Sequence, residues 1–135
     1  MFDKLFSHTN TLQKGLDATA LRSKVINNNI ANAETPGFKS SSVDFETHFR
    51  NALLSQGSFE TKQTRSKHID FNTSLDSVTP MVHVNNKTSM RMDGNNVDID
   101  YENAELAKNA LMNTALIEKL NGEFRRLRMA IREGS

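Results

Sequence analysis

Apolar and small side chains recur at steps of three and four residues through the first quarter of the chain. This spacing is typical of one face of an α-helix. It predicts a helix from Phe2 to about Ala33, with a polar interruption near the middle of the face. The face consists of Leu5, Thr9, Leu12, Leu16, Thr19, Ser23, Ile26, Ile30 and Ala33.

The C-terminal region repeats the pattern without a break. Asp98 and Asp100 are plausible N-caps for a helix there, Glu102 and Glu105 then lie near the positive end of its dipole, and arginines lie near the negative end. Steps alternate between four and three, which is a heptad repeat with one polar member, Asn113. A buried Asn in such a seam commonly fixes register at some cost in stability. The repeat is Leu106, Ala110, Asn113, Ile117, Leu120, Phe124, Leu127 and Ile131.

Between the two regions the helical spacing fails. Two polar stretches, Ser40-Ser41-Ser42 and residues 55–77, predict loop. Residues 81–84 read as a strand, and we expect residues 87–92 to return and pair with it. A short helix is predicted just after the first turn region, from the spacing of Phe45, Phe49, Leu53 and Leu54.

A single amphipathic helix cannot bury its apolar face alone, so its stability must come from packing. We therefore predict a mainly α fold in which the long N- and C-terminal helices pack as a coiled-coil-like pair. The segments are residues 1–33 (first helix), 34–96 (an irregular segment with a short helix and a short β-hairpin) and 97–135 (second helix). Two helices leave apolar edges uncovered, which points to protein partners.

Composition narrows the possible functions. Only 36% of residues are apolar, against roughly 45–50% in typical chains counted with Gly. A net charge of +1 gives no strong pull toward nucleic acid or acidic lipid. No apolar run is long enough for membrane insertion. The polar residues among Met1–Leu16 argue against a cleavable signal peptide.

Candidate chemistry is sparse. The chain has no cysteine, and its four histidines are scattered without ligand spacing. The acidic stretch 93–100 lacks the order of a calcium loop, because Gly94 follows Asp93 directly. Arginines near the C-terminus alternate with glutamates, which favours a solvated or subunit-contacting face. We expect no enzyme activity, no metal and no cofactor.

The most specific stretch runs from Asn27 to Lys39. Pro36 disfavours the helical region for Thr35, and Pro36-Gly37 fits the centre of a type II turn, which needs a positive φ at the glycine. Read from the residues alone, this is a helix terminator followed by a turn.

At these residues the chain resembles the flagellar axial proteins, which form the rod, the hook and related parts. Their signature directly follows a first helix. A second similarity lies at residues 93–100, which open the C-terminal helix. The short length, the stretch 43–46 and this acidic entry are similar to the proximal rod proteins in particular. The signature turn positions are Asn29, Asn32, Thr35, Pro36, Gly37 and Phe38.

The resemblance implies a structural subunit of the proximal rod, stacked helically around the export channel and helping to transmit torque from the motor. It implies a place in the periplasmic rod of the basal body. The implied partners are copies of the chain, other rod proteins, the rod-to-MS-ring adaptor, the MS ring and the flagellar type III export gate. The expected subunit packing seam is Leu5, Leu12, Leu16, Ile26, Ile30, Leu106, Ala110, Ile117, Leu120, Phe124, Leu127 and Ile131.

Two further readings stay open. Early export substrates of this family are thought to dock at the gate through Phe-x-x-x-hydrophobic, which Phe45 and Phe49 match, as do Phe2 and Phe6. Simple packing is the favoured explanation of both pairs, and Phe45/Phe49 is the better docking candidate of the two. A generic coiled-coil adaptor is the alternative function. A basic-helix nucleic-acid binder is disfavoured by the near-neutral charge.

Overall fold

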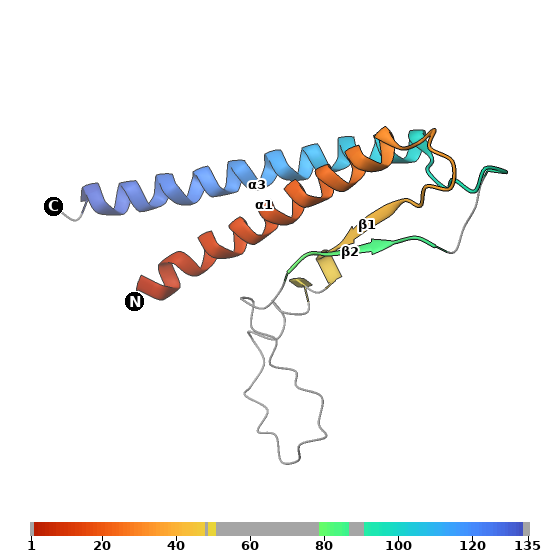
Figure 1. The fold of residues 1–135 in the computed structure, drawn as a ribbon. Coiled ribbons are helices and arrows are strands. Elements are labelled where there is room, and N and C mark those ends of the chain that lie inside the picture. The colour runs from red at the N-terminus through yellow and green to blue at the C-terminus, as the bar shows by residue number, and fades with distance from the viewer. Residues whose placement is uncertain (1, 48, 51–78, 87–90, 134–135) are drawn as a thin grey trace, which may run out of the picture.

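Two long antiparallel helices dominate the structure. The computed structural model describes residues 2–47, 49–50, 79–86 and 91–133. Helix α1 spans Phe2–Ala31 and helix α3 spans Ile99–Glu133. They lie side by side, with both chain termini at the same end (Figure 1). The predicted mainly α fold built on a terminal helix pair is confirmed, and the helix bounds fall within two residues of those predicted.

Local hydrogen bonds fix where each helix ends. Asp98 Oδ1 accepts from the backbone N–H of Asp100 at 3.0 Å and of Tyr101 at 3.2 Å, so Asp98 is the N-cap of α3. At the same end of the pair, the Thr35 N–H donates to Asn32 O at 3.0 Å in a tightened last turn after α1. Pro36 cannot continue that turn as a helix.

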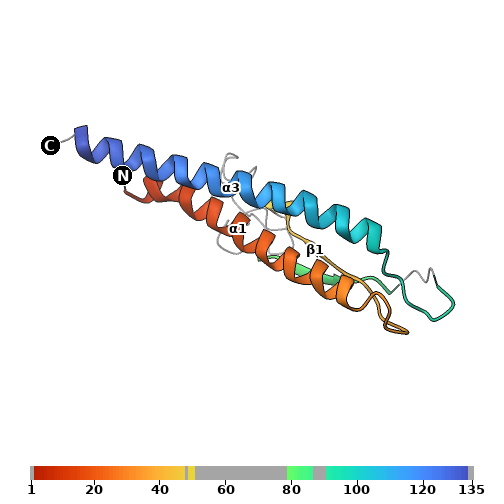
Figure 2. The same cartoon turned by 90° about the horizontal axis from the view of Figure 1, so that it is seen from above.

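The middle of the chain contributes a two-stranded ribbon. Strand β1, Ser41–Asp44, pairs antiparallel with β2, Met81–Val84, with Ser41 opposite Val84. The ribbon lies along α1, which is flanked by α3 on its other side (Figures 1 and 2).

The prediction of a strand at Met81–Val84 is confirmed, and the partner that the structure describes for it is β1, which the sequence did not predict. Of the predicted partner segment 87–92, residues 87–90 lie outside the described residues, and residues 91 and 92 are in a bend and a turn. The loop prediction at Ser40-Ser41-Ser42 was wrong for Ser41 and Ser42, which belong to β1. Contacts with α1 hold it extended instead: Val43 is buried, and the Asn29 side chain hydrogen-bonds both backbone groups of Ser41.

A small apolar core lies between α1 and the ribbon. Ala18, Val43 and Phe45 form its buried centre, and Leu21, Val25 and Phe49 pack around them. The Phe45 and Phe49 rings stack at 4.9 Å between centroids, and the Phe49 N–H donates to Phe45 O at 2.8 Å as in a helical turn. The rest of the predicted short helix, and the predicted loop at residues 55–77, lie outside the described residues.

The surface between the two long helices is unusually polar. Thr19, Asn29, Glu102 and Asn109 are all buried there, in company with the apolar Ile26. Buried polar groups are stable only when hydrogen-bonded, so this interface depends on specific partners. Within the described ranges, no helix combines the length and apolarity that a bilayer crossing needs.

Candidate subunit interface and the junction that holds it

The signature turn has the geometry that its sequence predicts. The Phe38 N–H donates to Thr35 O at 3.2 Å, and Gly37 adopts φ 72° at the third position of the turn. A Cβ built at Gly37 would meet no atom within 4 Å. Glycine is therefore required by the backbone conformation and not by crowding.

The segment 91–97 docks directly onto this turn. Asn95 is fully buried, and its Nδ2 donates to the carbonyls of Asn32, Ala33 and Thr35 at 3.0, 3.1 and 2.9 Å. Its Oδ1 accepts from the Val97 N–H at 2.7 Å. The side chain thus caps the end of α1 while shaping the entry to α3. We call this arrangement the Asn95 clasp.

Further hydrogen bonds close the clasp from both sides. The Gly37 N–H donates to Asp93 O at 2.9 Å, and Lys39 Nζ donates to Gly94 O at 2.7 Å. Arg91 donates to Ala33 O at 3.0 Å. The two motifs that the sequence shows far apart therefore bind one another.

Asn29 joins three elements at one point. Its side chain is fully buried; Nδ2 donates to Ser41 O at 2.7 Å and to Glu102 Oε1 at 2.9 Å, and Oδ1 accepts from the Ser41 N–H at 2.9 Å. Burial raises the pKa of Glu102, an effect that the Asn29 hydrogen bond partly offsets. Asn32, by contrast, acts locally, donating to Asn28 O at 2.9 Å.

Polar side chains also set the register of α3 on α1. Asn109 Nδ2 donates to Thr19 O at 2.9 Å and to Ser23 Oγ at 2.7 Å, and Asn113 Nδ2 donates to Thr19 Oγ1 at 2.9 Å. Two turns further along, Leu116 lies against Gly15, where an added Cβ would come within 3.3 Å of Leu116 Cδ1. The α1-facing edge of α3 thus carries positions 109, 113 and 116.

The opposite edge of the heptad repeat is uncovered in the single chain. It consists of side chains seven residues apart, of which Ile117 is 45% exposed, Phe124 46% and Ile131 75%. We call this set the uncovered line: Ala110, Ile117, Phe124 and Ile131.

In the single chain, the residues of the expected packing seam differ in burial. In α1, Ile26 is buried and Leu12, Leu16 and Ile30 are half-buried; the Leu5 side chain lies outside the description. In α3, the half-buried members are Leu106, Leu120 and Leu127. The remaining members of α3 form the uncovered line.

The sequence of this chain is similar to those of known proteins. A family model described as flagella basal body rod protein matches residues 10–39, which cover most of α1 and the signature turn. The flagellar basal body rod protein FlgB of Bacillus subtilis (strain 168) is 39% identical over 133 residues, which span 96% of this chain and 98% of the relative. The chain belongs to the FlgB family. FlgB of Borreliella burgdorferi is 36% identical over 79% of this chain and 78% of its own length, and FlgB of Escherichia coli (strain K12) is 28% identical over the whole of both.

As a FlgB-family member, the chain is a structural component of the flagellar basal body rod, where it assembles with other rod proteins. The family is a structural one and is not known for enzyme activity. The part of the chain that the structure describes contains no group of three or more His, Asp or Glu side chains positioned to hold a metal ion.

The structure also shows residues that sequence reasoning missed. Asn29 is one of the predicted signature positions, but its partner in the junction, Asn95, is not among the predicted site residues, and neither are Glu102 and Asn109, which are buried between the helices. Asn95 lies in the second motif that the resemblance singles out, which is the signal that could have found it. The candidate export motif is folded away, because Phe45 is only 5% exposed.

Proposed function

We propose that this FlgB-family chain is a subunit of the proximal rod, arranged helically around the export channel, and that it helps to transmit torque from the motor. Its neighbours in this proposal are copies of itself, other rod proteins, the rod-to-MS-ring adaptor and the MS ring. The observation that carries the proposal is the uncovered line on α3.

The uncovered line is an apolar stripe at heptad spacing that the chain itself does not use. Complete burial of a Phe or Ile side chain is worth roughly 1.5–3 kcal/mol relative to exposure. Ile117, Phe124 and Ile131 are each close to half exposed or more. They therefore retain much of that free energy for contacts with neighbouring helices, which is what an inner tube of packed helices requires.

The junction supports a role in carrying load. The Asn95 clasp ties the end of α1 to the start of α3, and Asn109 ties the helices together further along. Such directional bonds oppose sliding of one helix past the other, because a shift would leave buried polar groups unpaired. A subunit of this kind can pass a twisting force between its neighbours without changing its own shape.

Delivery to the rod is the remaining part of the proposal. The chain passes the flagellar type III export gate unfolded. Phe45 and Phe49 are the candidate gate-docking pair. Because Phe45 is buried in the folded chain, the pair can reach the gate only before the chain folds.

A matched pair of variants tests the packing proposal. Phe124→Ala should leave the isolated chain nearly as stable as the parent, because the ring is half exposed there. It should weaken subunit packing by up to ~2–5 kcal/mol, the usual cost of truncating a side chain that becomes buried. Arg126→Ala is the control: its side chain is 74% exposed, and its one acidic partner among the described residues is Glu123 of its own helix, at 2.8 Å.

The measurements are motility and the secreted and assembled fractions of each variant in a strain that lacks its own rod subunit. We expect Phe124→Ala to be exported but absent from rods, and Arg126→Ala to be motile. Motile Phe124→Ala cells beside non-motile Arg126→Ala cells would contradict the proposal. A closed oligomer of the purified chain that no other rod protein extends would favour the coiled-coil adaptor instead.

A further inference from the structure

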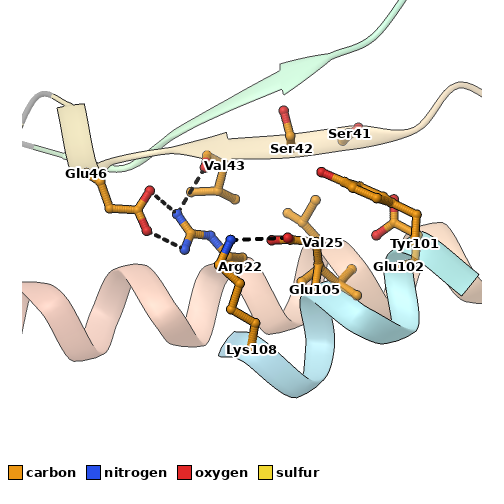
Figure 3. Close-up of a pocket in the computed structure, with 11 residues that line it drawn as sticks. Arg22, Val25, Ser41, Ser42, Val43, Glu46, Tyr101, Glu102, Glu105 and Lys108 are labelled. Carbon is orange, nitrogen blue, oxygen red and sulfur yellow. Dashed lines mark hydrogen bonds and ion pairs between the residues drawn. The ribbon is translucent and has the colours of Figure 1, made fainter. Parts of the chain in front are cut away.

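A pocket of about 210 Å³ opens where α1, β1 and the first turns of α3 meet (Figure 3). Val25, Ile26 and Val43 form its apolar wall. Tyr101 and Glu102 lie toward one end, and the Arg22–Glu46 pair lies at the other. Tyr101 is 61% exposed, so its ring borders the opening and is available to a guest side chain.

The lining of the pocket has an excess of negative charge. Three carboxylates face two cations, and both cations are already paired: Arg22 binds Glu46 at 2.7 and 2.9 Å, and Lys108 binds Glu105 at 3.2 Å. The third carboxylate, Glu102, has no cationic partner among the described residues. A cation would be stabilised here more than on the open surface of the protein, because the site is partly desolvated.

Glu102 is a buried carboxyl in the lining of the pocket, and in the described part of the chain only one of its two oxygens is hydrogen-bonded. The residue is 6% exposed, and only Oε1 is hydrogen-bonded, to Asn29 Nδ2. Within the described chain its second oxygen has no hydrogen-bond donor, although the residue lines the cavity. Burial raises the pKa of this carboxyl. A buried carboxylate with a free oxygen facing a cavity is a ready acceptor for a guanidinium or ammonium group.

The same chain presents a matching cationic surface at the other end of α3. Arg125 and Arg128 are exposed on one face, three residues apart, beside Phe124 of the uncovered line. The described residues provide neither arginine with an acidic partner. At 1.5 Å per helical residue, Arg128 lies about 39 Å along the axis from Glu102. The two sites therefore cannot meet within one chain.

We propose that the pocket receives an arginine from the Arg125–Arg128 face of a second copy of this chain. The guanidinium meets the free oxygen of Glu102, its methylene stem lies on the Val25–Val43 wall, and the Tyr101 ring covers the cation. Each copy then uses its pocket toward one neighbour and its arginines toward another. A head-to-tail contact extends an assembly when its rotation does not close into a ring, which is the arrangement that the proposed helical rod requires.

This contact rests on the proposed function, since it supplies one of the subunit contacts that the rod needs. The cysteine-free chain allows a direct test. Ala104→Cys places a thiol one turn from both Tyr101 and Lys108 at the rim, and Met129→Cys places one a turn from Arg125. Both positions are exposed. A short bis-maleimide should link the double variant into a ladder of covalent multimers, whereas Ala104→Cys with Leu111→Cys should give none.

Glu102→Gln removes the negative charge of the side chain but keeps its shape, so it tests the charge without changing the fold. Glutamine can still accept the Asn29 hydrogen bond, so the circular-dichroism melt should be unchanged or slightly raised. The yield of the ladder should fall roughly tenfold or more, the loss expected for a charged hydrogen bond, and Arg125→Gln with Arg128→Gln should have the same effect.

A ladder that Glu102→Gln leaves intact would overturn the assignment, as would a single cross-linked dimer, which indicates a closed contact. In basal bodies, a link from position 104 to a different polypeptide would show another occupant. If sedimentation still detects Phe124-dependent self-association while the 104–129 link is absent, only this inference fails. If self-association is absent and Phe124→Ala rods assemble, the proposed function fails with it.

Discussion

Removal of the Asn95 side chain tests whether the clasp holds the two helices together. Asn95→Ala deletes the donor to three carbonyls at the end of α1 and the acceptor for the Val97 N–H. These groups are screened from water, and each buried group left without a partner costs ~1–3 kcal/mol. Counting two such groups, we expect a loss of about 2–6 kcal/mol. Small domains are stable by only ~5–15 kcal/mol, so a large share of the stability would disappear.

Urea denaturation of the purified chain, followed by circular dichroism, measures this loss. Asn95→Asp keeps the shape and the acceptor but turns a carboxylate oxygen toward three carbonyl oxygens, so it should be at least as damaging as Ala. Asn27→Ala is the control, because Asn27 is exposed on α1 and alanine has the higher helix propensity. An Asn95→Ala chain within 0.5 kcal/mol (about the scatter of neutral surface changes) of the parent would refute the clasp.

Two further predictions concern the turn and the outer ion pair. Gly37→Val should lower stability by roughly 1–3 kcal/mol, because a β-branched residue resists φ 72°, while exposed Glu34→Ala should not; equal melting temperatures would contradict this. The hydrogen bond from Arg22 lowers the pKa of Glu46 in the folded chain. The pair therefore stabilises the fold fully above the ordinary glutamate pKa of about 4.3. This stabilisation is lost as the pH falls through the lowered pKa that Glu46 has in the folded chain. Glu46 is half exposed, so Glu46→Gln should cost at most ~1 kcal/mol at pH 7. The cost should shrink as the pH falls through the lowered pKa of Glu46; a difference that is independent of pH would exclude this role.

Sequence alone predicted most of the helical architecture. Helical spacing locates both long helices, Asp98 marks the start of α3, and Pro36-Gly37 predicts the turn that the φ of Gly37 confirms. Each of these signals is local: the residues that make the structure are neighbours in the chain. Local chemistry is where single-sequence reasoning is strongest.

The missed features depend on contacts between distant segments. β1 forms although serines favour loops, because Asn29 and β2 satisfy its backbone. In the sequence Asn95 looks like an ordinary turn residue, because its hydrogen-bond acceptors at the end of α1 lie about 60 residues earlier in the chain. The heptad pattern likewise does not decide how α3 is rotated about its own axis. Either positions 109 and 116 or positions 110 and 117 can face α1, because the two pairs lie on opposite sides of the same residues of the repeat.

That orientation explains how a chain with few apolar residues can serve a large assembly. The contact between its own helices uses Asn29, Asn109 and Asn113, whose hydrogen bonds fix one geometry and leave little freedom to slide. The larger apolar side chains of α3 are thereby left on the outer face. Hydrophobic burial is then greatest when neighbours arrive, so stability should rise with the number of subunits and with their concentration. A subunit arranged in this way is marginally stable alone and firmly held once its neighbours cover the uncovered line.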